Sequence, residues 1–322
     1  MDCATYPKQR IQSIQSLCRA LNVPEVQLQN VALRAERLYT PPKQKPKKNG
    51  GFRDVYDTKP PLKSLLKTIN AVLFRRVRFP KYLTGSLAGR DYVSNVEIHK
   101  GPREVITEDI AQFFDDITAE HVYDIWKNFF GFSEDVSNIL TQLTTKENRV
   151  YQGTPTSSYL ANLAFWDREP AMVARLAERD ITYSRYVDDV TISSKHPIIR
   201  EDRTWAIGQI YGMISAAGFQ PKRTKHGRFT AQKPITIMGL NANSTRAPTL
   251  PKSQRANIRA QVFQLERRFA AGDHGPGFMK SLNQASGRVG LLMRLHESEA
   301  EALRTRLKAL YELANSQVSS VS

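Results

Sequence analysis

The chain has 322 residues, 40% of them hydrophobic, with a formal net charge of +16 and an isoelectric point near 9.9. This length allows a sizeable core, whereas a mean hydropathy of −0.46 and the lack of any run of 18 apolar residues argue against a membrane-spanning helix. Because the basic clusters are spread along a foldable chain, they predict an extended contact with nucleic acid in preference to an anionic membrane.

The first 40 residues predict two helices. Apolar residues at helical spacing between Ile11 and Leu21 describe the first, and Pro24 opens a second that reaches Leu38. The stretch lacks the uninterrupted apolar core of a signal peptide, so we expect a cytoplasmic protein. Two cysteines are too few for a metal cluster, and we expect no disulfide in that compartment.

Residues 41–51 are basic and rich in proline and glycine. They fit either a solvated linker or the tip of a β-hairpin whose second strand covers residues 52–56. Two prolines then precede a helix over residues 62–76, and the apolar face of that helix is expected to pack in the core.

The first notable carboxylate, Asp109, lies in a strand-like segment over residues 104–110. A helix is expected over residues 113–130, with a helical connection over residues 131–150. Gln152 and Gly153 follow, and a glycine at this point permits a ligand to approach the backbone closely. The next helix is expected to cover residues 158–180.

A second pair of carboxylates, Asp188 and Asp189, interrupts a run of β-branched and aromatic residues over 181–193. This pattern predicts a hairpin with both aspartates at its turn. An Asp-Asp pair alone is compatible with an ordinary polar turn. Together with Asp109, it also fits a two-metal site that clamps the attacking and leaving oxygens of a phosphoryl displacement.

The remaining chain alternates basic and amphipathic segments. A helix is expected over residues 207–217, then an acid-free basic stretch over residues 220–233, and then a strand, Gly239 and a second strand over residues 235–243. Three basic amphipathic helices complete the chain, over residues 256–271, 277–295 and 299–314.

Three of these segments, taken in order, resemble the motifs of reverse transcriptases. They are VITEDIAQFFDDI around Asp109, QGTPTSSYLANL from Gln152, and YVDD around Asp188. The second segment has Ser158 where the family usually has proline. Three motifs in the right order are far more specific than any one of them.

Further elements are similar to those of bacterial retron reverse transcriptases. Asn95 and His99 match an N-A-x-x-H element before the first aspartate, with valine in place of alanine. Gly239 and Asn243 match a V-T-G-L-x-V-N element, with methionine in place of threonine. Lys225 takes the lysine position of an N-x-x-K-T element whose other residues are replaced.

The resemblance implies an α+β fold of the right-hand polymerase type, with fingers, a palm that carries an antiparallel sheet, and a helical thumb. We expect an N-terminal helical segment over residues 1–40 and fingers over residues 41–108. The palm would cover residues 109–243, with fingers helices over about 119–150, and the thumb residues 244–322.

The resemblance also implies a site for two Mg²⁺ ions and a deoxynucleoside triphosphate. The metal ligands would be Asp109, Asp188 and the backbone carbonyl of Ile110, with Asp189 binding directly or through an intermediate group. Nucleotide-binding roles fall to Arg53, Phe114, Gln152 and Lys225, and contacts to RNA template to Asn95, His99, Gly239 and Asn243.

Three of these roles have structural alternatives. His99 could serve only to hydrogen-bond a loop, and Phe114, which the resemblance places under the sugar, could be ordinary core. Lys225 could be a general acid toward pyrophosphate, a neutralising charge, or part of a solvated basic loop that touches backbone phosphate.

The implied activity is RNA-directed DNA polymerisation, in which a cognate structured non-coding RNA is copied into branched, RNA-linked single-stranded DNA (msDNA). The implied partners are this RNA and its RNA–DNA product, dNTPs, a defence effector protein in an antiphage system, and a host ribonuclease H that removes template. The alternatives are another compact prokaryotic reverse transcriptase, of the diversity-generating or intron-derived type, or a catalytically idle RNA-binding scaffold. The complete set of aspartates argues against the scaffold.

Overall fold

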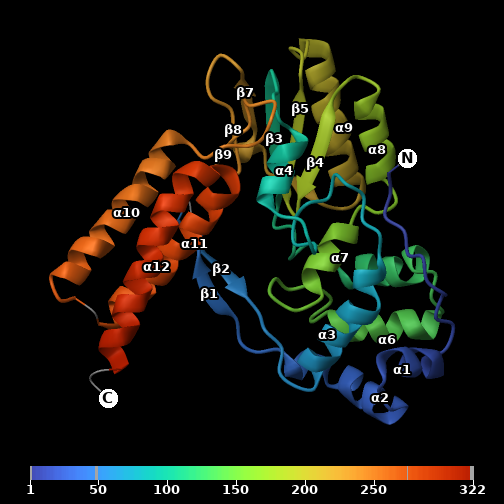
Figure 1. Cartoon of the computed structure of the whole chain (residues 1–322). Coiled ribbons are helices and arrows are strands. Elements are labelled where there is room, and N and C mark those ends of the chain that lie inside the picture. The colour runs from blue at the N-terminus through green and yellow to red at the C-terminus, as the bar shows by residue number, and fades with distance from the viewer. Residues whose placement is uncertain (1, 48–49, 274, 320–322) are drawn as a thin grey trace. The chain divides into compact units, whose positions relative to one another are not determined.

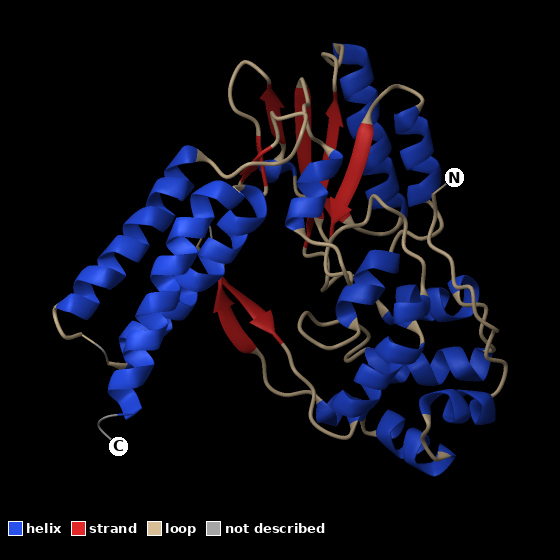
Figure 2. Cartoon of the chain, viewed as in Figure 1, coloured by secondary structure: helices blue, strands red, loops and turns tan. Residues whose placement is uncertain are grey.

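The computed structural model describes residues 2–47, 50–273 and 275–319, which fall into two compact units. Unit 1 consists of Met1–His99 and Arg103–Thr230, and unit 2 of Lys100–Pro102 and Ala231–Ser322. Both units combine helices and strands, as expected for an α+β protein (Figures 1 and 2). No helix in the described ranges is both long and apolar enough to cross a lipid bilayer.

Unit 1 is organised around a five-stranded antiparallel sheet (Figure 1). Its spatial order is β4 (Thr182–Tyr186), β5 (Asp189–Ser194), β3 (Glu104–Ala111) and β6 (Gln220–Pro221), and β7 (Gly227–Thr230) also pairs with β3. Most side chains of β3 are buried on both faces of the sheet. Part of the basic stretch over residues 220–233 therefore joins the sheet, because its backbone pairs with β3.

Unit 1 also contains many helices, some of which pack against this sheet while others lie apart from it (Figure 1). They are α1 (Ile14–Leu21), α2 (Glu25–Leu33), η1 (Ala35–Leu38), α3 (Leu62–Val72), η2 (Phe74–Arg76), α4 (Tyr92–Ile98), α5 (Ala119–Asp124), η3 (Ile125–Phe129), α6 (Glu134–Thr144), α7 (Ser157–Leu163), α8 (Glu169–Ala177), α9 (Arg200–Ala216) and η4 (Arg223–Lys225). The two N-terminal helices are confirmed. Ser13 caps the start of α1, and Asn22 ends it in a left-handed conformation.

Two long helices expected from the sequence are wrong, because each is interrupted. Residues 112–116 form a turn after β3, and α5 begins only where the Thr118 side chain caps it. Residues 164–168 separate α7 from α8, and Pro170 lies in the first turn of α8. Proline lacks an N–H and presets the first turn, so it favours the start of a new helix over continuation of the old one.

The hairpin alternative for residues 41–56 is confirmed. Strands β1 (Lys43–Pro46) and β2 (Phe52–Val55) pair antiparallel, with Lys45 opposite Arg53. Both strands are largely exposed, so the hairpin is held by its own backbone pairing rather than by a core. Lys48 and Asn49, part of the expected basic tip, lie outside the described residues.

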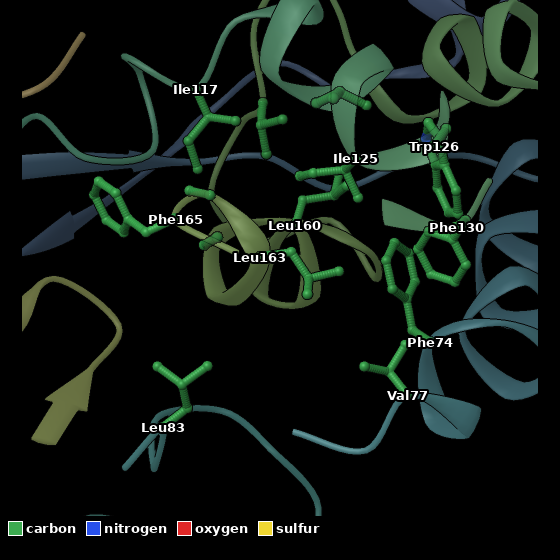
Figure 3. Close-up of a cluster of buried hydrophobic side chains, with 14 of the residues drawn as sticks. Phe74, Val77, Leu83, Ile117, Ile125, Trp126, Phe130, Leu160, Leu163 and Phe165 are labelled. Carbon is green, nitrogen blue, oxygen red and sulfur yellow. The ribbon is translucent and has the colours of Figure 1, made fainter. Parts of the chain in front are cut away.

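The core of unit 1 is rich in aromatic rings (Figure 3). Trp126 is fully buried, with its ring centroid 4.8 Å from that of Phe130 and 4.9 Å from that of Phe74. Phe165 stacks on Phe113 at 5.8 Å, which connects the turn after β3 to the segment between α7 and α8. This packing fixes the chain directly after Asp109.

Unit 2 contains a hairpin and the three expected C-terminal helices. Strands β8 (Thr236–Ile237) and β9 (Leu240–Asn241) form the hairpin, and α10 (Lys252–Ala270), α11 (Pro276–Leu295) and α12 (Glu297–Ser319) pack on one another. The expected boundary between palm and thumb, at residue 243, falls after this hairpin. The hairpin belongs to unit 2 together with these helices, and the chain passes from unit 1 to unit 2 after residue 230; the division between palm and thumb stays a prediction.

A buried polar network holds α4 against the β4–β5 hairpin. The ring nitrogens of His99 each lie 2.7 Å from a serine hydroxyl, that of Ser193 on β5 and that of Ser184 on β4. The Asn95 side-chain oxygen accepts hydrogen bonds from Ser184 and Thr84. Burial lowers the pKa of His99 to about 3, so its ring is neutral at physiological pH.

We expect Leu140→Ala to lower the free energy of unfolding of unit 1 by about 2–5 kcal/mol, since the side chain on α6 is fully buried and leaves a cavity. Leu33→Ala removes the same atoms from a side chain that is 81% exposed and should change the stability by less than about 0.5 kcal/mol. Urea unfolding of both variants measures the difference. Equal losses would contradict the burial of α6.

The neutral state of His99 predicts a pH-dependent loss of stability. In the unfolded chain His99 binds a proton below its ordinary pKa of 6.5, whereas in the folded chain it binds one only near pH 3. Protonation therefore favours the unfolded chain, and the stability present above pH 6.5 is lost as the pH falls. Between pH 7 and pH 5 this loss is about 2 kcal/mol. When the free energy of unfolding is measured in urea at both pH values, its decrease from pH 7 to pH 5 should be correspondingly smaller for His99→Gln than for the unmodified protein. Equal decreases in the two proteins would refute the prediction.

Candidate active site

Strand pairing brings the three predicted aspartates to one place. Asp109 near the end of β3 lies directly opposite Asp189 at the start of β5. Asp188 precedes Asp189 in the tight turn after β4, and its carbonyl accepts a hydrogen bond of 3.1 Å from the Ile110 amide. The site is therefore built from the ends of adjacent strands. Asp109 and Asp188 are 79 positions apart in the sequence.

Burial, together with the neighbouring carboxylates, raises the pKa values of Asp188 and Asp189. Burial raises the pKa of Asp189 to about 6, and the nearby charges of Asp188 and Asp109 add to the effect. Burial also raises the pKa of Asp188, with a further contribution from the charge of Asp109. A cation bound among them would offset both causes, since it favours the ionised forms.

Lys225 supplies the positive charge nearest to this cluster. Its Nζ lies 2.5 Å from Oδ2 of Asp109. Burial alone would lower the pKa of Lys225, but the hydrogen bond and the charge of Asp109 outweigh it, and the pKa is raised. Lys225 is therefore a cation, and η4 presents it to the site because β6 and β7 on either side pair with β3.

One cavity of about 950 Å³ is lined by two of the three aspartates, Asp109 and Asp188, and by all four predicted nucleotide-binding residues. Asp109, Ile110 and Asp188 contribute to its lining. The predicted nucleotide-binding residues that also line it are Arg53, Phe114, Gln152 and Lys225. These residues come from β2, the turn after β3, the segment before α7, and η4. A cavity lined by both carboxylates and cations suits a substrate that carries both metal and phosphate.

Gln152 reaches the cavity through a close backbone contact with the hairpin. The Gln152 carbonyl accepts a hydrogen bond of 2.8 Å from the Tyr56 amide, just after β2. Gly153 has φ of +110°, and a Cβ there would lie 2.4 Å from the Tyr56 carbonyl oxygen. Only glycine fits this contact. The expected close approach at Gly153 is thus made by the protein's own hairpin.

The donors in this cavity suit a divalent cation with an open coordination sphere. In the described part of the chain, no three His, Cys, Asp or Glu side chains form a cluster that would hold a metal by themselves. Polymerase Mg²⁺ sites use one or two carboxylates, with substrate phosphates and water as the other ligands. Asp109 and Asp188 fit that arrangement, and Lys225 on Asp109 partly neutralises it when no cation is bound.

Of the four residues predicted to contact RNA, Asn95 and His99 lie in unit 1 outside the lining of this cavity, whereas Gly239 and Asn243 belong to unit 2. Asn95 and His99 are each only 1% exposed; Asn95 bonds β4, and His99 bonds both β4 and β5, where the alternative for His99 expected a loop. In unit 2, Gly239 occupies the turn of the β8–β9 hairpin with φ of +84°. Asn243 accepts a hydrogen bond of 2.7 Å from the Ile235 amide, which closes that hairpin.

Several cavity residues escaped sequence reasoning. Lys222 lines the cavity, and its amide donates a 2.7 Å hydrogen bond to the Asp109 carbonyl. Tyr151, Phe52 and Lys47 also line it. The acid-free composition of residues 220–233 was a signal for Lys222. No comparable signal marks Tyr151, whose position depends on the hairpin.

Comparison with known proteins agrees with this geometry. Residues 45–242 match the family model described as reverse transcriptase (RNA-dependent DNA polymerase). The chain is 33% identical over 304 residues to the retron Se72 reverse transcriptase of Salmonella heidelberg, covering 93% of this chain and 80% of that protein. It is 30% identical over 315 residues to the retron Ec48 reverse transcriptase of Escherichia coli, covering 93% and 76%.

Among solved structures, telomerase from Candida albicans in complex with a telomeric RNA fragment aligns with a TM-score of 0.46 and 11% identity, over 84% of this chain and 56% of that one. This likeness is too low to add to the assignment. The family match spans more than half of the chain, and the Salmonella relative is matched over most of its length. The chain belongs to the reverse transcriptase family and is a retron-type RNA-directed DNA polymerase.

Proposed function

We propose that this reverse transcriptase copies a cognate structured non-coding RNA into branched, RNA-linked single-stranded DNA, as the polymerase of a retron in an antiphage defence system. The observation that carries the proposal is the cavity in which Asp109 and Asp188 face Arg53, Phe114, Gln152 and Lys225. The retron-specific product is supported by similarity to two retron reverse transcriptases over 93% of the chain. A net charge of +16 favours a tight, salt-dependent complex with RNA.

In this proposal Asp109, Asp188 and the Ile110 carbonyl would hold two Mg²⁺ ions, and Asp189, which lies opposite Asp109, would support them. Bound Mg²⁺ would lower the pKa of the primer hydroxyl and stabilise the leaving pyrophosphate. The protein's own part is to hold these carboxylates in a fixed arrangement at the end of the sheet. The antiparallel register fixes Asp109 relative to Asp189 without help from a ligand.

The remaining cavity residues act on the nucleotide. Arg53 on the exposed hairpin is placed to neutralise triphosphate charge, and Gln152 to hydrogen-bond the nucleotide or the template. Lys225, kept protonated by Asp109, neutralises the departing pyrophosphate and can donate a proton to it. Phe114 is half-buried in the cavity wall, where its ring would pack under the sugar.

The proposed partners follow from this reaction. The substrates are dNTPs and the cognate RNA, and the product remains attached to that RNA. A host ribonuclease H would remove copied template, and an effector protein would couple the complex to defence. Similarity to retron enzymes supports these partners.

The test uses protein co-expressed and purified with the RNA encoded next to its gene. With Mg²⁺ and labelled dNTPs, we expect DNA that is covalently attached to RNA and that changes mobility after ribonuclease treatment. Asp188→Asn should lower synthesis by about 1,000-fold or more, because a ligand to a catalytic metal contributes several kcal/mol to the transition state. Asp180→Asn, an exposed position beyond α8, is the matched control and should retain full synthesis.

The other outcomes of this assay separate the alternatives. Synthesis only on an added primer–template would retain the polymerase and reject the retron product, in favour of another compact prokaryotic reverse transcriptase. Full synthesis by Asp188→Asn would reject the assigned site. No Mg²⁺-dependent synthesis on any template would leave the RNA-binding scaffold.

We expect Phe114→Ala to admit ribonucleotides. Removing the ring opens the cavity wall where a 2′-hydroxyl would otherwise clash, so the preference for dNTP over rNTP, measured as the ratio of kcat/KM values, should fall by about tenfold or more. Single-nucleotide incorporation measures both substrates. An unchanged ratio with intact dNTP incorporation would support the alternative that Phe114 is ordinary core.

A further inference from the structure

A buried ion pair lies directly behind the catalytic turn. Arg185 on β4 is fully buried, and its Nε and Nη2 lie 2.6 and 2.8 Å from the two carboxylate oxygens of Glu169, which is also buried, at the start of α8. The Tyr183 hydroxyl donates to the same carboxylate at 2.7 Å. Side chains alternate along a strand, so Tyr183 and Arg185 point away from Ser184, which bonds His99 on the other face.

Every N–H of the Arg185 guanidinium has a partner. Two bond Glu169, and the other three donate to the backbone carbonyls of Ala161 at 3.3 Å, Asn162 at 3.0 Å and Val187 at 3.0 Å. Five donors are all that this side chain has. Arg185 therefore connects α7, α8 and the turn that carries Asp188.

The bond to Val187 matters because that residue is in an unfavourable conformation. Val187 has φ of +61°, a left-handed conformation that a β-branched residue rarely adopts. Such a residue persists only where its surroundings hold it. Arg185 holds the Val187 carbonyl, and Gly85 packs against the Val187 amide so closely that a Cβ on Gly85 would lie 2.5 Å from it.

These contacts fix Asp188 from both sides. On one side, Arg185 binds the carbonyl of Val187, the residue directly before Asp188. On the other side, the Asp188 carbonyl accepts a hydrogen bond of 3.1 Å from the Ile110 amide. Asn162 reinforces the arrangement, since its side chain donates to the Gly85 carbonyl at 2.9 Å while its own carbonyl accepts from Arg185. The orientation of the Asp188 carboxylate is thus tied to the guanidinium of Arg185.

We propose that Arg185 and Glu169 are a positioning pair for polymerisation: Glu169 orients the guanidinium, and Arg185 holds the Val187 peptide so that Asp188 faces the reacting groups. The proposal rests on the role assigned to Asp188 above. A purely stabilising role would not need these residues, because well-packed apolar side chains serve stability as well as a buried ion pair does. An apolar pair, however, cannot bind the Val187 carbonyl.

The first experiment uses Arg185→Lys, which keeps the charge next to Glu169 but has too few donors, in the wrong geometry, to reach all three carbonyls. Hydrogen–deuterium exchange of the free protein should accelerate by about tenfold or more at residues 186–190, where the clamp is lost, and remain unchanged in α6. On a primed RNA template, kcat should fall by about 10- to 100-fold while KM for dNTP stays within about threefold.

Leu140→Ala provides the matched control. It destabilises unit 1 from α6 without touching the turn, so any loss of activity caused by lower stability alone would occur in this variant as well. We expect its kcat, per folded molecule, to stay within about twofold of the unmodified enzyme. If Leu140→Ala and Arg185→Lys lose kcat equally at equal loss of stability, the positioning role is overturned.

The double variant Arg185→Met, Glu169→Met completes the test. Removing both charges avoids an unpaired buried ion, so this variant should be more stable than Glu169→Gln while its kcat stays low. A double variant with full kcat would overturn the proposal. A wrong assignment of Asp188 can be told apart from a wrong positioning role. If the assignment is wrong, Asp188→Asn remains active, whereas Arg185→Lys still accelerates hydrogen–deuterium exchange at residues 186–190.

Discussion

The pairing of β3 with β5 is the constraint on which the active site depends. It places Asp109 opposite Asp189 and, through the bond between the Ile110 amide and the Asp188 carbonyl, brings the third aspartate alongside. Burial of these carboxylates, and to a smaller extent their mutual repulsion, raises the pKa values of Asp188 and Asp189. The sheet maintains the arrangement because its central strand is buried on both faces and paired along both edges.

Polar groups behind the β4–β5 hairpin make the site rigid. On one face, His99 bridges serines of both strands, and on the other, Arg185 and Glu169 reach the turn itself. Buried polar groups are costly unless every donor and acceptor is satisfied. Here the Arg185 donors and both His99 ring nitrogens are satisfied, so the networks fix one geometry instead of several.

The cavity joins this rigid sheet to elements of different character. The β1–β2 hairpin is exposed and held mainly by its own pairing, yet it contributes Arg53. Lys225 comes from a segment that the sheet holds from both sides. The carboxylates thus lie on the buried, doubly paired sheet. Arg53, one of the candidates for binding phosphate, lies on the exposed hairpin. A nucleotide that enters would contact both.

The sequence by itself determined the family, the α+β class, the aspartates and four further residues that line the cavity with Asp109 and Asp188, because catalytic motifs are local and their order survives in the chain. It also predicted the three C-terminal helices from periodicity. Only the tertiary structure showed that β6 and β7 join the sheet, that the helix after Asp109 begins at Ala119, and that Asn95 and His99 are buried. These features depend on long-range backbone pairing and on which face of an element is covered, and neither quantity is encoded within a short window of sequence.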